Sequence, residues 1–236
     1  MALPKLSNIT YDLNLPSTGE KLKFRPFLVK EQKALMIAQE SEDDKQIENA
    51  FAQIINDCTF GELNAYTMPM FDIEYVFLQM RGKSVGEKVK LNLLCPDDEK
   101  TRVDVEVDLK DVDVQMSNDH TNIVQLTDNI HIVMKYPTLS DMAGFDDKGQ
   151  IQSIFEMIKR CVYEIHDGET VHNKVDISEK ELEEFIESMS TENFENLSAF
   201  FETMPKLQHV IEVKNPKTKK KNEILIEGLQ LSLIHI

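Results

Sequence analysis

The chain contains 236 residues, which is enough for one large or two small domains with a hydrophobic core. It carries 42 Asp and Glu residues against 26 Lys and Arg residues, and its formal net charge is -16. This charge argues against a general nucleic-acid binder, which needs a basic surface to contact phosphates.

The N-terminal residues 1–13 contain no long apolar run, so the sequence predicts neither a secretory signal nor a membrane-spanning segment. The three cysteines, Cys58, Cys95 and Cys161, are far apart and odd in number. This pattern is typical of reduced, buried thiols. We therefore expect the protein to be made and kept in a cytoplasm.

A β-hairpin is predicted over residues 11–24. Tyr11, Leu13 and Leu15 alternate with polar residues, and the strand KLKF returns after the turn PSTGE. Gly19 lies in that turn, where a positive φ is expected.

Two helices are predicted after this hairpin, the first over about residues 29–39. The second begins where Ser41 and Asp44 form a capping arrangement. Its apolar stripe consists of Ile47, Ala50, Phe51, Ile54, Ile55 and Cys58.

A third predicted helix runs from Met68 or Phe71 to Arg81 and is apolar on two nearly opposite sides. One side contains Ile73, Val76, Phe77 and Met80, and the other contains Phe71, Tyr75 and Leu78. A helix of this kind is buried on both sides. Either it is central to its own domain, or a partner protein covers the second side.

Period-two alternation from Glu87 predicts an antiparallel hairpin with one charged, solvated face, whose strands meet at the turn CPDDEK. The segment DVDVQM is interpreted as a continuation of its second strand. Another strand pair, NIVQL and IHIVMKY, is joined at TDN, and Pro137 ends this β-rich section.

Helices return after the segment GFDDKG. The first has an apolar stripe made of Ile151, Ile154, Phe155, Ile158 and Val162. Ser178 and Glu181 form a capping box for the second, and a third ends before Pro205. Residues 209–229 indicate two strands around a basic loop. The order favours an α+β fold, in which antiparallel β-hairpins or a sheet combine with several amphipathic helices.

Three sections are expected, with provisional boundaries: residues 1–86 with the N-terminal hairpin and helices, residues 87–137 with the antiparallel β-strands, and residues 138–230 with helices and a terminal hairpin. They could equally form one compact unit. Residues 231–236, LSLIHI, match a reading of a sequencing-library transposon end and are interpreted as adapter sequence. A natural apolar strand is the alternative.

The sequence contains no familiar catalytic or phosphate-binding motif. His166, Asp167, Glu169 and His172 cluster in one segment and give the alternative of a metal-dependent or other hydrolase. Histidines six residues apart are not a known ligand spacing, however, and a solvated turn is the simpler interpretation.

The turn CPDDEK begins like a zinc knuckle, but Asp97 and Asp98 stand where a second cysteine would be needed. The loop NPKTKKKN contains no cysteine either. Both turns are therefore interpreted as metal-free, and we expect no cofactor.

The one dense basic patch contains Lys217, Lys219, Lys220 and Lys221. It could contact nucleic acid or an acidic protein surface. A lysine-rich hairpin tip also protects strand edges from pairing with other chains, which is the simpler interpretation.

Four stretches resemble the T4-like bacteriophage baseplate hub protein family of contractile-tail phages. They are residues 15–43, 70–87, 94–109 and 134–137, and the motifs RPFLVKE and FDIEYVFLQMRGKSVGE in this order are the most specific part. The resemblance implies a non-enzymatic protein that acts through protein surfaces, as a hub subunit or as a hub assembly factor. Some relatives carry paired cysteines in the two hairpin turns. This chain keeps only Cys95, so no metal site is carried over.

The resemblance also implies partners among other phage baseplate hub and tail proteins, with self-association left open. It places the protein in the host bacterial cytoplasm during virion assembly, and in the tail baseplate if it stays. The candidate partner-binding residues are Arg25, Phe27, Glu31, Phe71, Tyr75, Leu78, Arg81, Lys219 and Lys220.

Overall fold

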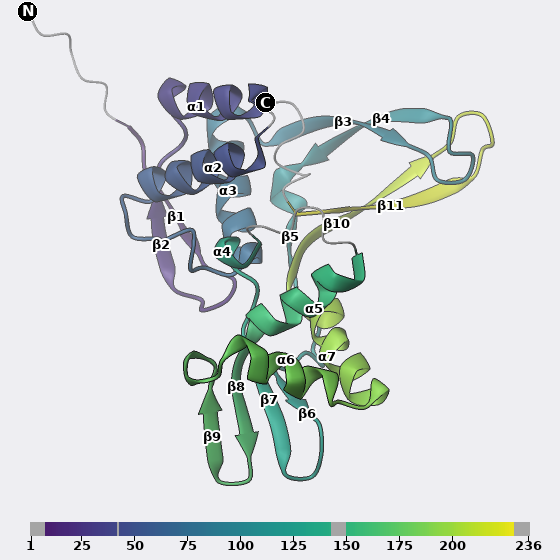
Figure 1. The fold of residues 1–236 in the computed structure, drawn as a ribbon. Coiled ribbons are helices and arrows are strands. Elements are labelled where there is room, and N and C mark those ends of the chain that lie inside the picture. The colour runs from purple at the N-terminus through teal and green to yellow at the C-terminus, as the bar shows by residue number, and fades with distance from the viewer. Residues whose placement is uncertain (1–7, 42, 143–149, 229–236) are drawn as a thin grey trace, which may run out of the picture. The chain divides into compact units, whose positions relative to one another are not determined.

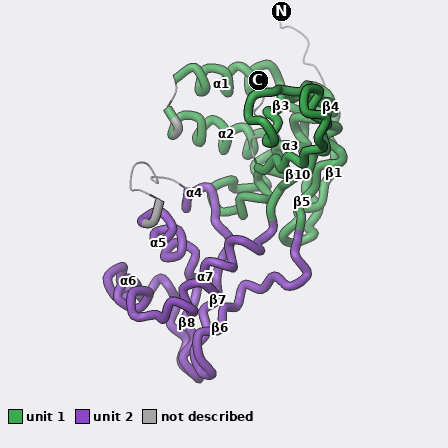
Figure 2. The backbone as a smooth tube through the Cα atoms, turned by 90° about the vertical axis from the view of Figure 1, so that its right-hand side faces the viewer, with its two compact units in different colours: residues 1–115, 206–236 green, residues 116–205 purple. Residues whose placement is uncertain are grey.

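A computed structural model describes residues 8–41, 43–142 and 150–228. The chain forms two compact units, which Figure 2 shows in different colours. Unit 1 contains residues 1–115 and 206–236, and unit 2 contains residues 116–205. The section boundaries predicted at residues 86 and 137 stay a prediction, and the interpretation of residues 231–236 falls outside the described residues. Helices and antiparallel sheets confirm the α+β class.

Unit 1 begins with the predicted hairpin and helices. Strands β1 (Tyr11–Asn14) and β2 (Lys21–Phe24) pair in antiparallel fashion. Helices α1 (Val29–Glu40), α2 (Asp44–Cys58) and α3 (Met70–Val85) follow (Figure 1).

The N-cap of α2 differs from the prediction. The Asp43 carboxylate accepts hydrogen bonds from the backbone N–H groups of Lys45 and Gln46, whereas Ser41 was expected to cap the helix. The Ser41 hydroxyl instead donates to the Ala38 carbonyl at the end of α1. Ser41 therefore belongs to the preceding helix end.

Helix α3 is buried on two sides within unit 1. On one side, the Phe77 ring contacts the rings of Phe27 and Phe51, with centroid separations of 5.2 Å and 4.6 Å. On the other side, Leu78 is fully buried and Tyr75 half-buried among residues of the β-strands. The second apolar side is thus covered by the chain itself, which is the intramolecular alternative.

Strands β3 (Lys88–Leu94) and β4 (Arg102–Asp108) form the predicted antiparallel hairpin. The segment DVDVQM does not continue β4, contrary to the prediction. Leu109–Asp111 form a 3-10 turn whose Lys110 N–H donates to the Asp108 carboxylate. The chain then enters β5 (Asp113–Gln115), which pairs with a strand from the C-terminal part of the chain.

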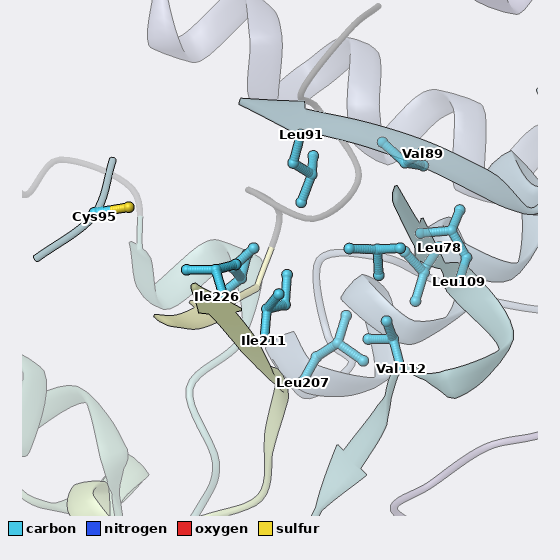
Figure 3. Packing of buried hydrophobic residues seen from close by; sticks show 11 residues of the cluster. Leu78, Val89, Leu91, Cys95, Leu109, Val112, Leu207, Ile211 and Ile226 are labelled. Atoms are coloured by element: carbon cyan, nitrogen blue, oxygen red, sulfur yellow. The ribbon is translucent and has the colours of Figure 1, made fainter. Parts of the chain in front are cut away.

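That strand is β10 (Lys206–Lys214), which also pairs with β11 (Lys221–Glu227) in the second predicted hairpin. The strand order of this sheet is β11-β10-β5. The β3–β4 and β10–β11 hairpins share one hydrophobic core, and Figure 3 shows Leu91 directed toward Ile211 and Ile226. We call these two packed hairpins the hairpin arm.

Unit 2 contains an antiparallel sheet with the strand order β6-β7-β8-β9. Its strands are β6 (Ile123–Gln125), β7 (Ile130–Met134), β8 (Val162–Asp167) and β9 (Thr170–Asn173). Its helical elements are α4 (Leu139–Met142), α5 (Gln150–Cys161), a 3-10 turn (Lys174–Asp176), α6 (Glu179–Glu187) and α7 (Thr191–Thr203). Buried residues of the sheet and the helices, among them Ile132, Ile158, Leu182 and Leu197, form its core.

The sequence predicted β6, β7 and three of these helices, and the Ser178–Glu181 capping box is present. It did not predict β8 and β9. Val162, assigned to the helical stripe, begins β8, and Ile154 of the same stripe is 46% exposed. The side chain of Ile151 lies outside the described residues.

Candidate partner-binding surfaces

The RPFLVKE segment is held by a buried ion pair. The Arg25 guanidinium donates to the Glu31 carboxylate at 2.8 Å, and the Leu28 backbone N–H donates to the same carboxylate at 2.8 Å. Arg25 and Glu31 are 7% and 4% exposed. Burial tends to raise the pKa of Glu31, but the hydrogen bonds from Arg25 and Leu28 outweigh it and hold this pKa below its usual value. Glu31 therefore caps α1 from inside unit 1.

The candidate residues on α3 also lie inside unit 1. Phe71, Leu78 and Arg81 are buried, and Tyr75 is half-buried. Phe27 is half-buried too, and its backbone N–H donates to the Ser84 hydroxyl at 2.7 Å. A role of these residues in partner binding stays a prediction, and their burial indicates that they support a surface.

Sequence reasoning did not single out Asp72, which lies in the first turn of α3. Asp72 is fully buried, and its carboxylate accepts hydrogen bonds from the backbone N–H and the hydroxyl of Ser17. Burial raises the pKa of this carboxyl group. The pair ties the β1–β2 turn to the start of α3.

Three hairpins of unit 1 use the same five-residue turn. In each turn the second residue is proline, and the backbone N–H of the fifth residue donates to the carbonyl of the first at 2.8 to 3.0 Å. The turns are Leu15–Gly19, Cys95–Glu99 and Asn215–Lys219. The fifth residues, Gly19, Glu99 and Lys219, have φ angles of 71°, 52° and 65°. Only the first of these is a glycine, the residue that adopts this conformation without steric cost.

The two tips of the hairpin arm are joined through Asp97. Its carboxylate accepts hydrogen bonds from Asn215 Nδ2 at 2.8 Å, from Asn222 Nδ2 at 3.1 Å and from the Thr218 hydroxyl. Its backbone N–H donates to Asn222 Oδ1. The hydrogen bonds from Thr218 and Asn215 hold the pKa of Asp97 below its usual value. Sequence reasoning noticed Asp97 only as a residue in place of a cysteine.

Lys219 and Lys220 lie exposed at the same tip of the arm, beyond β10 and β11. They are the two candidate partner-binding residues that are exposed. Their contact with a partner stays a prediction.

The two histidines of the hydrolase alternative do not converge. In the antiparallel register, His166 is opposite Val171, and His172 is opposite Ile165. Because neighbouring residues of a strand point to opposite faces, His166 and His172 lie on opposite faces of the sheet. The His166 ring instead stacks on His131, with a centroid separation of 4.4 Å, and its Nε2 lies 3.0 Å from a Glu164 oxygen.

Metal and thiol chemistry find little support in the described part of the chain. No group of three or more His, Cys, Asp and Glu residues there could hold a metal ion. Burial raises the pKa of the Cys58 and Cys161 thiols to about 12, which disfavours the nucleophilic thiolate form. No described helix is long and apolar enough to span a bilayer.

The described residues thus define an α+β protein whose polar motifs mostly hold hairpins and helices together. Residues 7–232 match the family of the T4 bacteriophage base plate protein, and the chain belongs to this family. This match confirms the resemblance to T4-like baseplate proteins. No curated protein and no solved structure matches the chain.

Proposed function

We propose that this baseplate protein is a hub subunit or a hub assembly factor, and that it acts by binding other tail proteins rather than by catalysis. The observation that carries the proposal is the family match over residues 7–232. The assignment of the protein to the hub rests on the stretches that resemble hub proteins, such as RPFLVKE. The protein would act in the host bacterial cytoplasm during assembly of the contractile tail, and as a subunit it would stay in the virion.

The positions of the resembling residues support a binding role. Arg25 and Glu31 stabilise the start of α1, and Asp97 joins two hairpin tips, so these polar groups serve the fold. The histidines of the hydrolase alternative lie on opposite faces of their sheet. Other tail proteins would then bind to the exposed surface of the fold that these buried polar groups stabilise.

The test is co-expression of the full chain with the hub and tape-measure proteins of its phage, followed by size-exclusion chromatography with mass detection. A stoichiometric complex that persists in assembled baseplates identifies a structural subunit. Binding to intermediates without retention in baseplates identifies an assembly factor. The absence of any complex would overturn the proposal.

A further inference from the structure

The outer face of the β3–β4 hairpin is electrostatically self-complementary. Its cross-strand pairs are Lys88 with Asp108, Lys90 with Glu106, and Asn92 with Asp104. Lys88 Nζ lies 2.8 Å from a Glu106 carboxylate oxygen, and Asn92 donates to Asp104 at 2.6 Å. The charges on this face are matched by charges of the same hairpin.

The outer face of the β10–β11 hairpin has a different pattern. Its cross-strand pairs are Val210 with Leu225, Glu212 with Glu223, and Lys214 with Lys221. All six residues are exposed, and Val210 and Leu225 are 53% and 51% exposed. Among the residues that the structure describes, none of the four charged side chains forms an ion pair.

Like charges directly opposite each other destabilise a sheet. Diagonal attraction between the Glu212–Glu223 row and the Lys214–Lys221 row offsets part of this repulsion. Protection of exposed edges does not explain the like-charge pairing, because the matched charges of β3–β4 give the same protection. A protein partner that supplies the opposite charges does explain it.

We propose that the outer face of β10–β11 is a docking face for another protein of the baseplate, an inference that rests on the proposed function. The partner places an apolar side chain over Val210 and Leu225. It places a basic group between Glu212 and Glu223, and an acidic group between Lys214 and Lys221.

The spacing of the rows defines the shape of the partner segment. Successive rows are two residues apart along each strand, which corresponds to about 6.6 to 6.8 Å. Alternate side chains of an extended segment have the same spacing. The partner segment therefore carries apolar, basic and acidic residues at positions i, i+2 and i+4. A surface hollow lined by Glu212, Lys221, Asn222 and Glu223 lies where the basic group enters.

The exposed Lys219 and Lys220 extend the basic end of this face toward the tip. Lys219 has a φ of 65° at the turn position where the first hairpin has Gly19. Glu99 has the same conformation in the β3–β4 turn, so the contribution of Lys219 to the docking face is its exposed positive charge and not its backbone conformation.

The test compares two charge reversals in the complex with the co-expressed hub and tape-measure proteins. Glu223→Lys makes its row self-complementary but loses the attraction to Lys214 and Lys221, so we expect a melting temperature close to wild type and an affinity lowered by about tenfold or more. Glu106→Lys on β3–β4 changes the net charge equally and breaks the pair with Lys88. We expect it to lower the melting temperature and to leave the affinity within about twofold of wild type.

Leu225→Ser provides a second variant that does not depend on charge. Because Leu225 is exposed, we expect the fold to persist and the affinity to fall. Equal affinities of wild type, Glu223→Lys and Leu225→Ser would overturn the docking face and leave the proposed function intact. A wild-type chain that forms no complex would overturn both.

Two further outcomes would assign the face to another occupant. If the wild-type chain dimerises alone and Glu223→Lys abolishes the dimer, the face binds a second copy of the chain. That outcome would overturn the proposal. In the other outcome, the wild-type chain binds a DNA or RNA duplex in a salt-dependent way while the variants leave every hub complex unchanged. That outcome would overturn the proposal as well.

Discussion

The β3–β4 and β10–β11 hairpins share one core but differ on their outer faces. Inside, both contribute buried aliphatic residues such as Leu91 and Ile211. Outside, β3–β4 pairs Lys90 with Glu106, whereas β10–β11 pairs Glu212 with Glu223. The like-charge row Glu212–Glu223 contributes less to hairpin stability than the matched pairs of β3–β4. The difference supports the proposal that the outer face of β10–β11 serves a partner, whereas that of β3–β4 serves the fold.

The largest expected effect concerns the shared core. Leu91 is 2% exposed, so Leu91→Ala should lower the free energy of unfolding by about 2 to 5 kcal/mol. Leu225→Ala, on the outer face, should change it by less than about 0.5 kcal/mol. Urea unfolding followed by circular dichroism measures both. Similar losses for the two variants would show that the outer face is part of the core.

The second effect compares a buried charge pair with the exposed pairs of the arm. Glu31→Gln leaves the buried Arg25 without a charged partner and should cost about 3 kcal/mol of stability. Lys88→Ala, in an exposed pair, should change the unfolding midpoint little. If both variants unfold alike, the Arg25–Glu31 pair is more solvated than its burial indicates.

The pH dependence of Glu31 gives a further effect. Its pKa in the folded protein lies below the usual value of 4.5, so its stabilising contribution is present above that pH. The contribution is lost as the pH falls through the folded pKa. We expect the stability difference between wild type and Glu31→Gln to be constant near neutral pH and to shrink below pH 4.5. A difference that grows in acid would contradict this sign.

A smaller effect tests the hydrogen bonds of Asp97 that connect the tips of the β3–β4 and β10–β11 hairpins. Asp97→Ala removes the acceptor for Asn215, Thr218 and Asn222, and should lower the melting temperature and speed amide exchange at both tips. Asp104→Ala is the control, because Asp104 accepts from Asn92 within one hairpin. Faster exchange at one tip alone would mean that Asp97 does not couple the two.

The smallest effects compare charge reversals on the two hairpins. Glu223→Lys should leave the free energy of unfolding within about 0.5 kcal/mol of wild type, because the attraction gained with Glu212 is offset by repulsion from the Lys214–Lys221 row. Glu106→Lys should lower the melting temperature, because it breaks the pair with Lys88. Thermal unfolding of both proteins at low salt measures the two changes, and high salt should reduce them. A larger loss of stability with Glu223→Lys than with Glu106→Lys would contradict the contrast between the two faces.

Strong periodicity let the sequence predict the hairpins of unit 1 and most helices. It failed for β9, because all four residues Thr170–Asn173 are exposed and no alternation marks them. It predicted a strand over the segment that contains β5 but joined it to β4, because the true partner strand begins only at Lys206. Both strands depend on tertiary pairing, which local patterns do not report.

The candidate surface was only partly predictable. The tip residues Lys219 and Lys220 were singled out by composition, but the rows of Glu212 and Lys214 were not. Such rows depend on the strand register, which the turn geometry sets. The turn Asn215–Lys219 repeats the pattern of Leu15–Gly19 with proline second, and this shared pattern was the signal that could have fixed the register.

The most direct measurement is zero-length carboxylate–amine cross-linking of the wild-type complex with hub and tape-measure proteins, read by mass spectrometry. Both hairpins carry exposed acids and lysines, so each serves as the control for the other. We expect cross-links to the partner from Glu212, Glu223, Lys214 or Lys221. Cross-links confined to Lys88, Lys90 or Glu106 would contradict the assignment of the docking face to β10–β11.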